Sequence, residues 1–365
     1  MKNKKVILAM SGGVDSSVSA HILLNLGYTV SGIFMKNWEE DDTINYCASS
    51  KDLNDAKQVC QKLGIYLHEV NFSAEYWDNV FENFLLSHQQ GKTPNPDILC
   101  NKKIKFGVLF DFIIYQLQSD YIATGHYAQI KYFNKKPMLI RSVDINKDQS
   151  YFLYTLSSEK LKKILFPIGH LTKQEVRTIA KKIKLHNANK KDSTGICFIG
   201  PNKNFHFLSR FISSRKGNIV TEQGYIIGTH NGLINYTIGQ RKKIGIGGKF
   251  DKKNTPWYVI SKNLMKNSLI VAQGHNNIRL FSIGAIIFNV HWIHKLNILN
   301  GLVCTVKTRY RQKDISCQIF FINIFSIKII FKKPESSITP GQSVVFYSQD
   351  ICLGGGIITQ AIPLY

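Results

Sequence analysis

The start of the chain constrains its fold more than any other segment, because an apolar run passes directly into a glycine-containing turn. Residues 6–10 form the run, and Ser11 to Ser17 (SGGVDSS) lead from it into a segment with helical spacing. A turn between a strand and a helix directs backbone amides and the helix dipole at an anion, and serine hydroxyls add donors. The sequence therefore predicts a phosphate or pyrophosphate site. The turn contains no lysine, so it is not a Walker A loop.

The pattern of apolar residues divides the chain into an α/β part and an all-β part. The first 200 residues alternate strand-like runs with helical periods, which is typical of a parallel sheet covered by helices. The predicted strands are Val6 to Met10, Thr29 to Met35, Tyr66 to Asn71 and Tyr121 to Thr124. From about Gly217 the runs are short, β-branched and aromatic. We expect a Rossmann-like α/β domain over 1–200, a small β-rich domain over 201–274 and a C-terminal β-barrel over 275–365.

Two helices of the first part have recognisable ends. Apolar residues at helical spacing between Leu53 and Leu63 predict a helix that stops at Gly64, with Cys60 in the core. Thr172 and Glu175 have the spacing of a capping box, which predicts the start of a second helix there.

Composition favours a polyanionic partner and gives no sign of a membrane segment. The net charge is +23, from 47 basic and 24 acidic residues, and clustered cations bind phosphates. An AT-biased genome would also enrich lysine, so charge alone is weak support. The longest apolar run, Ile319 to Phe331, is interrupted by polar residues and is shorter than the roughly 20 residues that span a bilayer. We expect a cytoplasmic protein, since the N-terminal apolar run is too short for a signal peptide.

The seven cysteines indicate neither a disulfide framework nor a zinc ribbon. They stand at positions 47, 60, 100, 197, 304, 317 and 352, and no CxxC occurs. Most are expected to be small buried hydrophobes. Cys100 and Cys197 differ by context: the two prolines of TPNP (93–96) predict a polar loop around Cys100, ahead of a helix near residues 106–117, and DSTGICF predicts a loop around Cys197.

Eight motifs in order give the chain a specific resemblance. They are AMSGGVDSSVSA, KTPNPDILCNKKIKF, ATGHYA, KDQSYFL, KDSTGICFIG, GQRKKIGIGG, TRYRQ and CLGGGII. The first resembles the loop of the PP-loop ATP pyrophosphatases, which adenylate an oxygen atom. The whole set resembles the tRNA-specific 2-thiouridylases, which place sulfur on C2 of the wobble uridine.

The resemblance implies a reaction in which ATP makes a carbonyl oxygen a leaving group before a sulfur nucleophile attacks. Cys197 resembles the persulfide carrier, and Cys100 the cysteine that attacks it, liberating sulfide or forming a transient Cys100–Cys197 disulfide. Asp97 resembles the acid or base that serves the uridine. It could instead only cap a turn. A persulfide sulfur-donor protein is implied as a partner.

The same resemblance assigns binding residues. ATP, with Mg²⁺ near Asp15, is expected to contact Ala9, Met10, Ser11, Gly12, Gly13, Val14, Asp15, Ser16, Met35 and Gly125. The target base is expected at Asn95, Pro96 and Asp97, and the anticodon stem-loop of tRNA at His126, Lys147, Asp148, Gln149, Arg309, Tyr310 and Gln342. Basic and aromatic side chains suit phosphates and an unstacked base. No metal site built by the protein alone is expected from these assignments.

Three other readings stay open at this point. A PP-loop enzyme that amidates a small carboxylic acid would share SGGVDSS but would need no cysteine pair. A catalytically inactive tRNA-binding protein would need none of the catalytic residues. Finally, Asp97, Cys100 and Cys197 could hold an iron–sulfur cluster that carries the sulfur.

Overall fold

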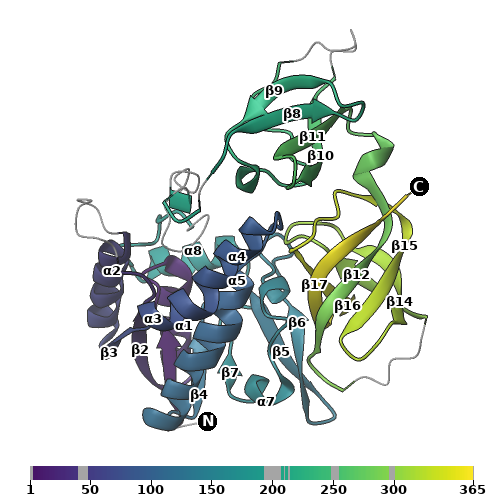
Figure 1. Ribbon diagram of the computed structural model, residues 1–365. Coiled ribbons are helices and arrows are strands. Elements are labelled where there is room, and N and C mark those ends of the chain that lie inside the picture. The colour runs from purple at the N-terminus through teal and green to yellow at the C-terminus, as the bar shows by residue number, and fades with distance from the viewer. Residues whose placement is uncertain are drawn as a thin grey trace.

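The structure is a computed structural model that describes residues 3–39, 48–192, 207–208, 210–212, 214–247, 255–295 and 301–364. Figure 1 shows three units: a parallel sheet with its helices, a four-stranded sheet above, and a barrel beside them. The predicted fold, an α/β domain followed by a β-rich domain and a β-barrel, is confirmed.

The first unit is built on a five-stranded parallel sheet of order β3-β2-β1-β4-β7. Its strands are β1 Lys5–Ala9, β2 Thr29–Lys36, β3 Leu67–Asn71, β4 Tyr121–Thr124 and β7 Ile164–Leu165. All four predicted strands are therefore present. The central residues of β1, β2 and β4 are mostly apolar and buried because helices cover both faces of the sheet, whereas the edge strand β3 has no fully buried residue.

The helices of this unit follow their sequence signals. They are α1 Val14–Asn25, α2 Ala48–Leu63, α3 Ser73–Tyr76, α4 Glu82–Gln89, α5 Pro96–Leu99, α6 Leu109–Asp111, α7 Ser158–Leu161 and α8 Lys173–Lys182, with π-helical turns at Trp77–Phe81, Cys100–Val108 and Phe112–Gln116. The helix α2 stops before Gly64, as predicted, and Gly64 has a φ of 67°. Cys60 is buried, which was also predicted. The capping box of Thr172 and Glu175 is formed at the start of α8.

The prediction of a loop around Cys100 is wrong. The helix begins at Pro96 and continues through Cys100 to Gln116, with non-helical backbone angles inside it only at Gly107. Proline is favoured at the first helical position, where its missing N–H costs no hydrogen bond. Asn95 caps the helix, since its side chain accepts a hydrogen bond of 3.1 Å from the Asp97 amide. Pro96 therefore starts this helix.

The second unit is a four-stranded sheet of order β10-β11-β8-β9 with a core of its own. The strands are β8 Gly217–Thr221, β9 Ile226–His230, β10 Trp257–Asn263 and β11 Ser268–Gln273. Its described helical turns are the 3₁₀ turns Leu233–Asn235 and, in the connection to the barrel, Ile278–Leu280.

The third unit is a six-stranded barrel of order β12-β15-β14-β13-β16-β17, closed by pairing of β12 with β17. Its strands are β12 Phe281–Trp292, β13 Leu302–Lys307, β14 Ile315–Phe321, β15 Ser326–Ser336, β16 Ser343–Ser348 and β17 Ile351–Pro363. A hairpin of the first unit, β5 Ala128–Phe133 and β6 Lys136–Arg141, joins the barrel through the pairing of Ile140 with Ile351. Figure 1 shows this hairpin between the two units.

Candidate active site

The SGGVDSS turn connects β1 to α1 and leaves the first amides of α1 available. Gly13 is the N-cap and supplies no side-chain acceptor, so these amides have no partner within the helix. The Ser16 and Ser17 hydroxyls donate to the Gly13 carbonyl at 3.0 and 2.9 Å, which stiffens the turn. Gly12 has a φ of 68°, a conformation that side chains disfavour. The arrangement provides amide donors and a helix dipole for an anion.

The turn lies where ligands bind in open parallel sheets. The chain leaves β1 for β2 and β3 on one side, whereas β4 and β7 lie on the other, which makes the edge between β1 and β4 a topological switch point. Gly125 follows β4, and a Cβ at this position would lie 2.8 Å from the Ser16 nitrogen. Only glycine therefore allows this close approach. Met35 lies near the end of β2 and is partly buried against the core.

Two residues that follow α8, Asn187 and Lys190, donate hydrogen bonds to the SGGVDSS turn. The Asn187 side-chain amide donates to the Gly12 carbonyl at 3.0 Å and to the Ser17 hydroxyl at 2.9 Å. The Lys190 ammonium group donates to the same carbonyl at 3.1 Å and forms ion pairs with Asp52 and Asp55 on α2. Asn187 is buried, so this support is part of the core.

Asp15, in the first turn of α1, lies in a network of charges. The Lys173 ammonium group donates to both Asp15 carboxylate oxygens at 2.8 Å and to Asp192 at 2.7 Å. The Tyr127 hydroxyl also donates to Asp15, at 2.9 Å. Burial and the neighbouring Asp15 charge raise the pKa of Tyr127, so its hydroxyl keeps its proton.

Asp97 and Cys100 lie three residues apart on one helix and therefore face the same way. Cys100 is buried in the core, and Asp97 is partly exposed. Burial raises the pKa of Asp97, although the nearby Lys105 opposes the shift. A carboxyl group that retains its proton more readily than usual suits transfer of a proton to or from a substrate.

His126 is buried beside the end of β4. Its Nδ1 atom lies 2.7 Å from the Thr124 hydroxyl, and the rings of Phe106 and Phe166 are each 6.0 Å from the imidazole. Burial, assisted by Lys105, lowers the pKa of His126 well below its ordinary value. The imidazole is therefore neutral at physiological pH and can offer a hydrogen bond but no charge.

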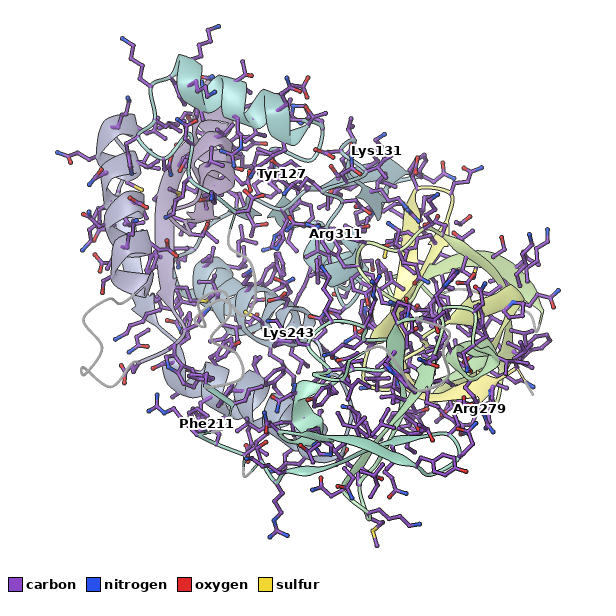
Figure 2. All side chains as sticks on the ribbon, turned by 90° about the horizontal axis from the view of Figure 1, so that it is seen from above. Tyr127, Lys131, Phe211, Lys243, Arg279 and Arg311 are labelled. Atoms are coloured by element: carbon purple, nitrogen blue, oxygen red, sulfur yellow. The ribbon has the colours of Figure 1, made fainter. Side chains whose placement is uncertain are left out.

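The segment Lys147 to Gln149 is fixed to its surroundings in three ways. Lys147 forms an ion pair with Asp192. Asp148 is buried, and its carboxylate accepts hydrogen bonds from Ser142 and Ser150. Gln149 exchanges hydrogen bonds of 2.7 and 2.9 Å with the backbone of Tyr127, whose place is labelled in Figure 2.

The barrel brings its own predicted residues to this segment. The Tyr310 hydroxyl donates to the Lys147 carbonyl at 3.3 Å, and its ring lies 4.4 Å from that of Phe152. Arg309 donates to the Ser336 carbonyl at 2.8 Å. The Gln342 amide donates to the Thr93 carbonyl at 2.6 Å, two residues ahead of the helix N-cap Asn95. The structure thus brings barrel residues to both the Lys147 and the Asp97 segments.

Cys197 lies outside the described residues, and so does the loop predicted around it, apart from its first residue, Asp192. In the part of the chain that is described, no group of three or more His, Cys, Asp or Glu side chains is arranged to hold a metal ion. Over the same residues, none of the helices combines the length and apolar character needed to cross a membrane.

Comparison with known proteins decides the family. A tRNA methyl transferase HUP domain profile matches residues 4–201, a tRNA methyl transferase PRC-barrel profile matches 205–273, and an aminomethyltransferase β-barrel profile matches 284–358. The tRNA-specific 2-thiouridylase of Buchnera aphidicola subsp. Schizaphis graminum is 62% identical over 363 residues, covering 100% of this chain and 99% of the relative. The chain belongs to the tRNA-specific 2-thiouridylase family.

Other comparisons extend this picture. The 2-thiouridylase of Salmonella typhimurium is 56% identical over 361 residues, covering 99% of this chain and 98% of the relative. Among solved structures, the U34-tRNA thiolase NcsA from Methanococcus maripaludis, with its [4Fe-4S] cluster, matches at 20% identity and a TM-score of 0.35 over 57% of this chain and 63% of that one. A structural overlap of this size supports no conclusion about this chain.

In this member of the 2-thiouridylase family, residues distant in sequence surround the SGGVDSS turn, and the sequence motifs did not predict them. Lys173 contacts Asp15, and Asp192 is linked to Asp15 through Lys173. Asn187 and Lys190 contact Gly12. The one signal available was the absence of lysine from SGGVDSS, which means that any cationic side chain beside this turn comes from elsewhere in the chain.

Proposed function

We propose that this chain uses ATP to adenylate the C2 oxygen of the wobble uridine in tRNA and then replaces that oxygen by sulfur, releasing pyrophosphate and AMP. Membership of the 2-thiouridylase family supports the reaction class, a tRNA sulfurtransferase. The proposed partners are the anticodon stem-loop of tRNA and a protein that carries a persulfide. We also propose the cytoplasm as its compartment.

One observation carries the proposal: Tyr127 joins the proposed ATP loop to the proposed tRNA segment. Its hydroxyl donates to Asp15 of the loop, and its backbone exchanges two hydrogen bonds with Gln149. His126, another proposed tRNA contact, precedes it in sequence. An adenylating enzyme must hold the α-phosphate and the target oxygen together, and this connection favours such an arrangement.

The phosphate loop fits ATP and Mg²⁺ by the nature of its donors. The α1 amides and the glycine backbone suit phosphate oxygens. Mg²⁺ is usually held by one or two carboxylates together with substrate phosphates, and Asp15 presents a carboxylate that is 29% exposed beside the loop. Magnesium would neutralise charge on the phosphates. Asp15 is the residue proposed to hold it.

The sulfur chemistry is proposed as follows. The terminal sulfur of a Cys197 persulfide attacks C2 of the adenylated uridine, and AMP leaves with the former C2 oxygen. The Cys100 thiolate attacks the Cys197 sulfur, so the S–S bond of the persulfide breaks and a Cys100–Cys197 disulfide forms. A cellular thiol then reduces this disulfide. Asp97, on the same helical face as Cys100, holds or accepts a proton at the base.

The decisive experiment is mass spectrometry of tRNA nucleosides after incubation with ATP, Mg²⁺ and a persulfide source. We expect 2-thiouridine at the wobble position, and none when ATP is left out. Cys100→Ser and Cys197→Ser should each abolish the product. The matched control, Cys60→Ala, changes a buried cysteine of α2 and should keep activity. Thiouridine formed by either catalytic-cysteine variant would contradict the assignment.

Sulfur carried by an iron–sulfur cluster is tested separately. Anaerobic purification followed by iron analysis and a visible spectrum distinguishes the two mechanisms. We expect no stoichiometric iron if Cys197 carries a persulfide. If the unaltered chain contains iron and absorbs visible light, and a Cys100→Ser variant does neither, the result would favour a cluster.

A further inference from the structure

The phosphate loop lacks a cation of its own. SGGVDSS contains an aspartate and no lysine or arginine. When ATP is cleaved between its α and β phosphates, negative charge develops on the departing pyrophosphate, and enzymes stabilise such charge with cations placed in advance. Any cationic side chain that acts on these phosphates beside the proposed Mg²⁺ must therefore come from another part of the chain.

Two lysines reach the loop among the described residues, and they approach it differently. Lys190 donates to the Gly12 carbonyl and is also paired with Asp52 and Asp55 on α2. Its charge is balanced by two carboxylates, and its contact is with a carbonyl of the turn. Lys190 therefore links the turn to α2.

Lys173 contacts the acidic residue of the loop. Its ammonium group lies 2.8 Å from both Asp15 carboxylate oxygens and 2.7 Å from Asp192. The side chain is 12% exposed. The capping box fixes the residue before it, and the Lys173 amide donates to Asp144 at 2.9 Å. The ammonium group is therefore held in place at the start of α8.

The carboxylates around Lys173 hold its ammonium group at the loop. Asp192 is shared among three cations, Lys147, Lys173 and Arg177, and Asp15 belongs to the loop itself. A third carboxylate, that of Asp144, accepts the hydrogen bond from the Lys173 amide. Phosphate oxygens accept hydrogen bonds from an ammonium group in the same way as carboxylate oxygens do. Phosphates could thus replace these carboxylates as acceptors.

We propose that Lys173 binds the phosphates of ATP that leave as pyrophosphate, supplying from α8 the cation that the loop lacks. This assignment rests on the proposed use of ATP. It gives the loop two sources of anion binding: backbone amides from α1 and one ammonium group from a residue 158 positions away from Asp15.

The test is isothermal titration calorimetry of the full chain with Mg-ATP, pyrophosphate and AMP. Lys173→Gln should lower the affinity for ATP and pyrophosphate roughly 10- to 100-fold and leave AMP binding within about twofold. Lys181→Gln removes an equal charge from an exposed position of the same helix and should change none of the three. Circular dichroism confirms that the variants are folded.

A second variant separates phosphate binding from a structural role. Asp192→Asn breaks the same ion-pair network but keeps the Lys173 ammonium group, so ATP binding should be unchanged or tighter. Equal weakening by Asp192→Asn and Lys173→Gln would overturn the assignment, as would unchanged ATP binding in Lys173→Gln or an equal loss for AMP. If the unaltered chain does not bind ATP, the proposed function fails, and the assignment with it.

Discussion

Three carboxylates near the site are surrounded differently, and the surroundings determine what each can do. Asp15 is paired with the Lys173 ammonium group and the Tyr127 hydroxyl. Asp148 is buried and accepts hydrogen bonds from amides and a hydroxyl. Burial raises the pKa of Asp97, against the influence of Lys105. Asp15 therefore suits cation binding, Asp148 holds the segment around it in place, and Asp97 suits proton transfer.

The raised pKa of Asp97 predicts how Asp97→Asn affects stability. A carboxyl group whose folded pKa exceeds its unfolded value of 3.8 favours folding below that value, and this contribution is lost as pH rises through the folded pKa. Asparagine cannot ionise and avoids this loss. Asp97→Asn should therefore be at least as stable as the original chain at about pH 7 in urea unfolding, with the difference shrinking towards about pH 4.

The same variant should lose at least about 100-fold in thiolation rate, because general acid–base groups contribute factors of that order. The rate is measured by nucleoside mass spectrometry over time. A variant that is destabilised at neutral pH and keeps its thiolation rate would show that the role of Asp97 is structural only.

Asp148 is expected to matter for stability. Asp148→Ala leaves the Ser142 and Ser150 donors without an acceptor and removes the nearest carboxylate from buried Lys307, which lies 3.8 Å away. The free energy of unfolding should fall by about 3 to 5 kcal/mol. Asp111→Ala, at an exposed position, should change it by less than about 0.5 kcal/mol. Urea titrations measure both, and equal effects would contradict this interpretation.

At the scale of elements, the glycine turn and the helix that starts at Pro96 show what local sequence can and cannot predict. The strand–turn–helix at Ser11 to Ser17 and the capping box at Thr172 are confirmed because neighbouring residues determine them. The loop prediction at Cys100 failed because a proline at the first helical position has the same local sequence as a proline in a loop. The contact between Lys173 and Asp15 had no local signal, since it depends on tertiary packing.

The turn at Gly12 provides a matched pair of glycine variants. Gly12 and Gly27 both have positive φ, 68° and 80°, so alanine costs about 1 to 2 kcal/mol of backbone strain at each. A Cβ at Gly12 would also lie 2.2 Å from the Asp52 carbonyl oxygen, whereas a Cβ at Gly27 meets nothing within 4 Å. Gly12→Ala should abolish ATP binding in calorimetry and Gly27→Ala should retain it. Retained binding by Gly12→Ala would mean that the turn can move.

At the scale of the molecule, the first unit and the barrel share a hydrophobic core. The largest buried cluster contains Leu139 and Tyr151 from the first unit together with Val345, Tyr347 and Cys352 from the barrel. Arg141 strengthens this contact, since its guanidinium group lies 3.8 Å from the centre of the Tyr347 ring and pairs with Asp314. Composition and texture predicted three units, but the sharing of a core between two of them has no signature in the sequence. The boundaries near 200 and 275 stay predictions.

A shared core predicts cooperative unfolding of these two units. Variants that retain a single tryptophan report on each part: Trp38 packs on the shared core, Trp292 on the barrel core, and Trp257 lies in the core of the four-stranded sheet. The urea transitions of Trp38 and Trp292 should coincide, whereas that of Trp257 should differ. Separate midpoints for Trp38 and Trp292 would show that the units unfold independently.

The pairing of β6 with β17 also has a consequence for the order of events during synthesis. Residues 136–141 leave the ribosome early, but their partner strand, Ile351–Pro363, is among the last segments to be made. The apolar surface of Leu139 and Tyr151 must therefore wait through the translation of about two hundred residues before it is covered. A ribosome that stalls within the barrel leaves this surface exposed on an otherwise folded first unit, where chaperones and proteases recognise incomplete chains.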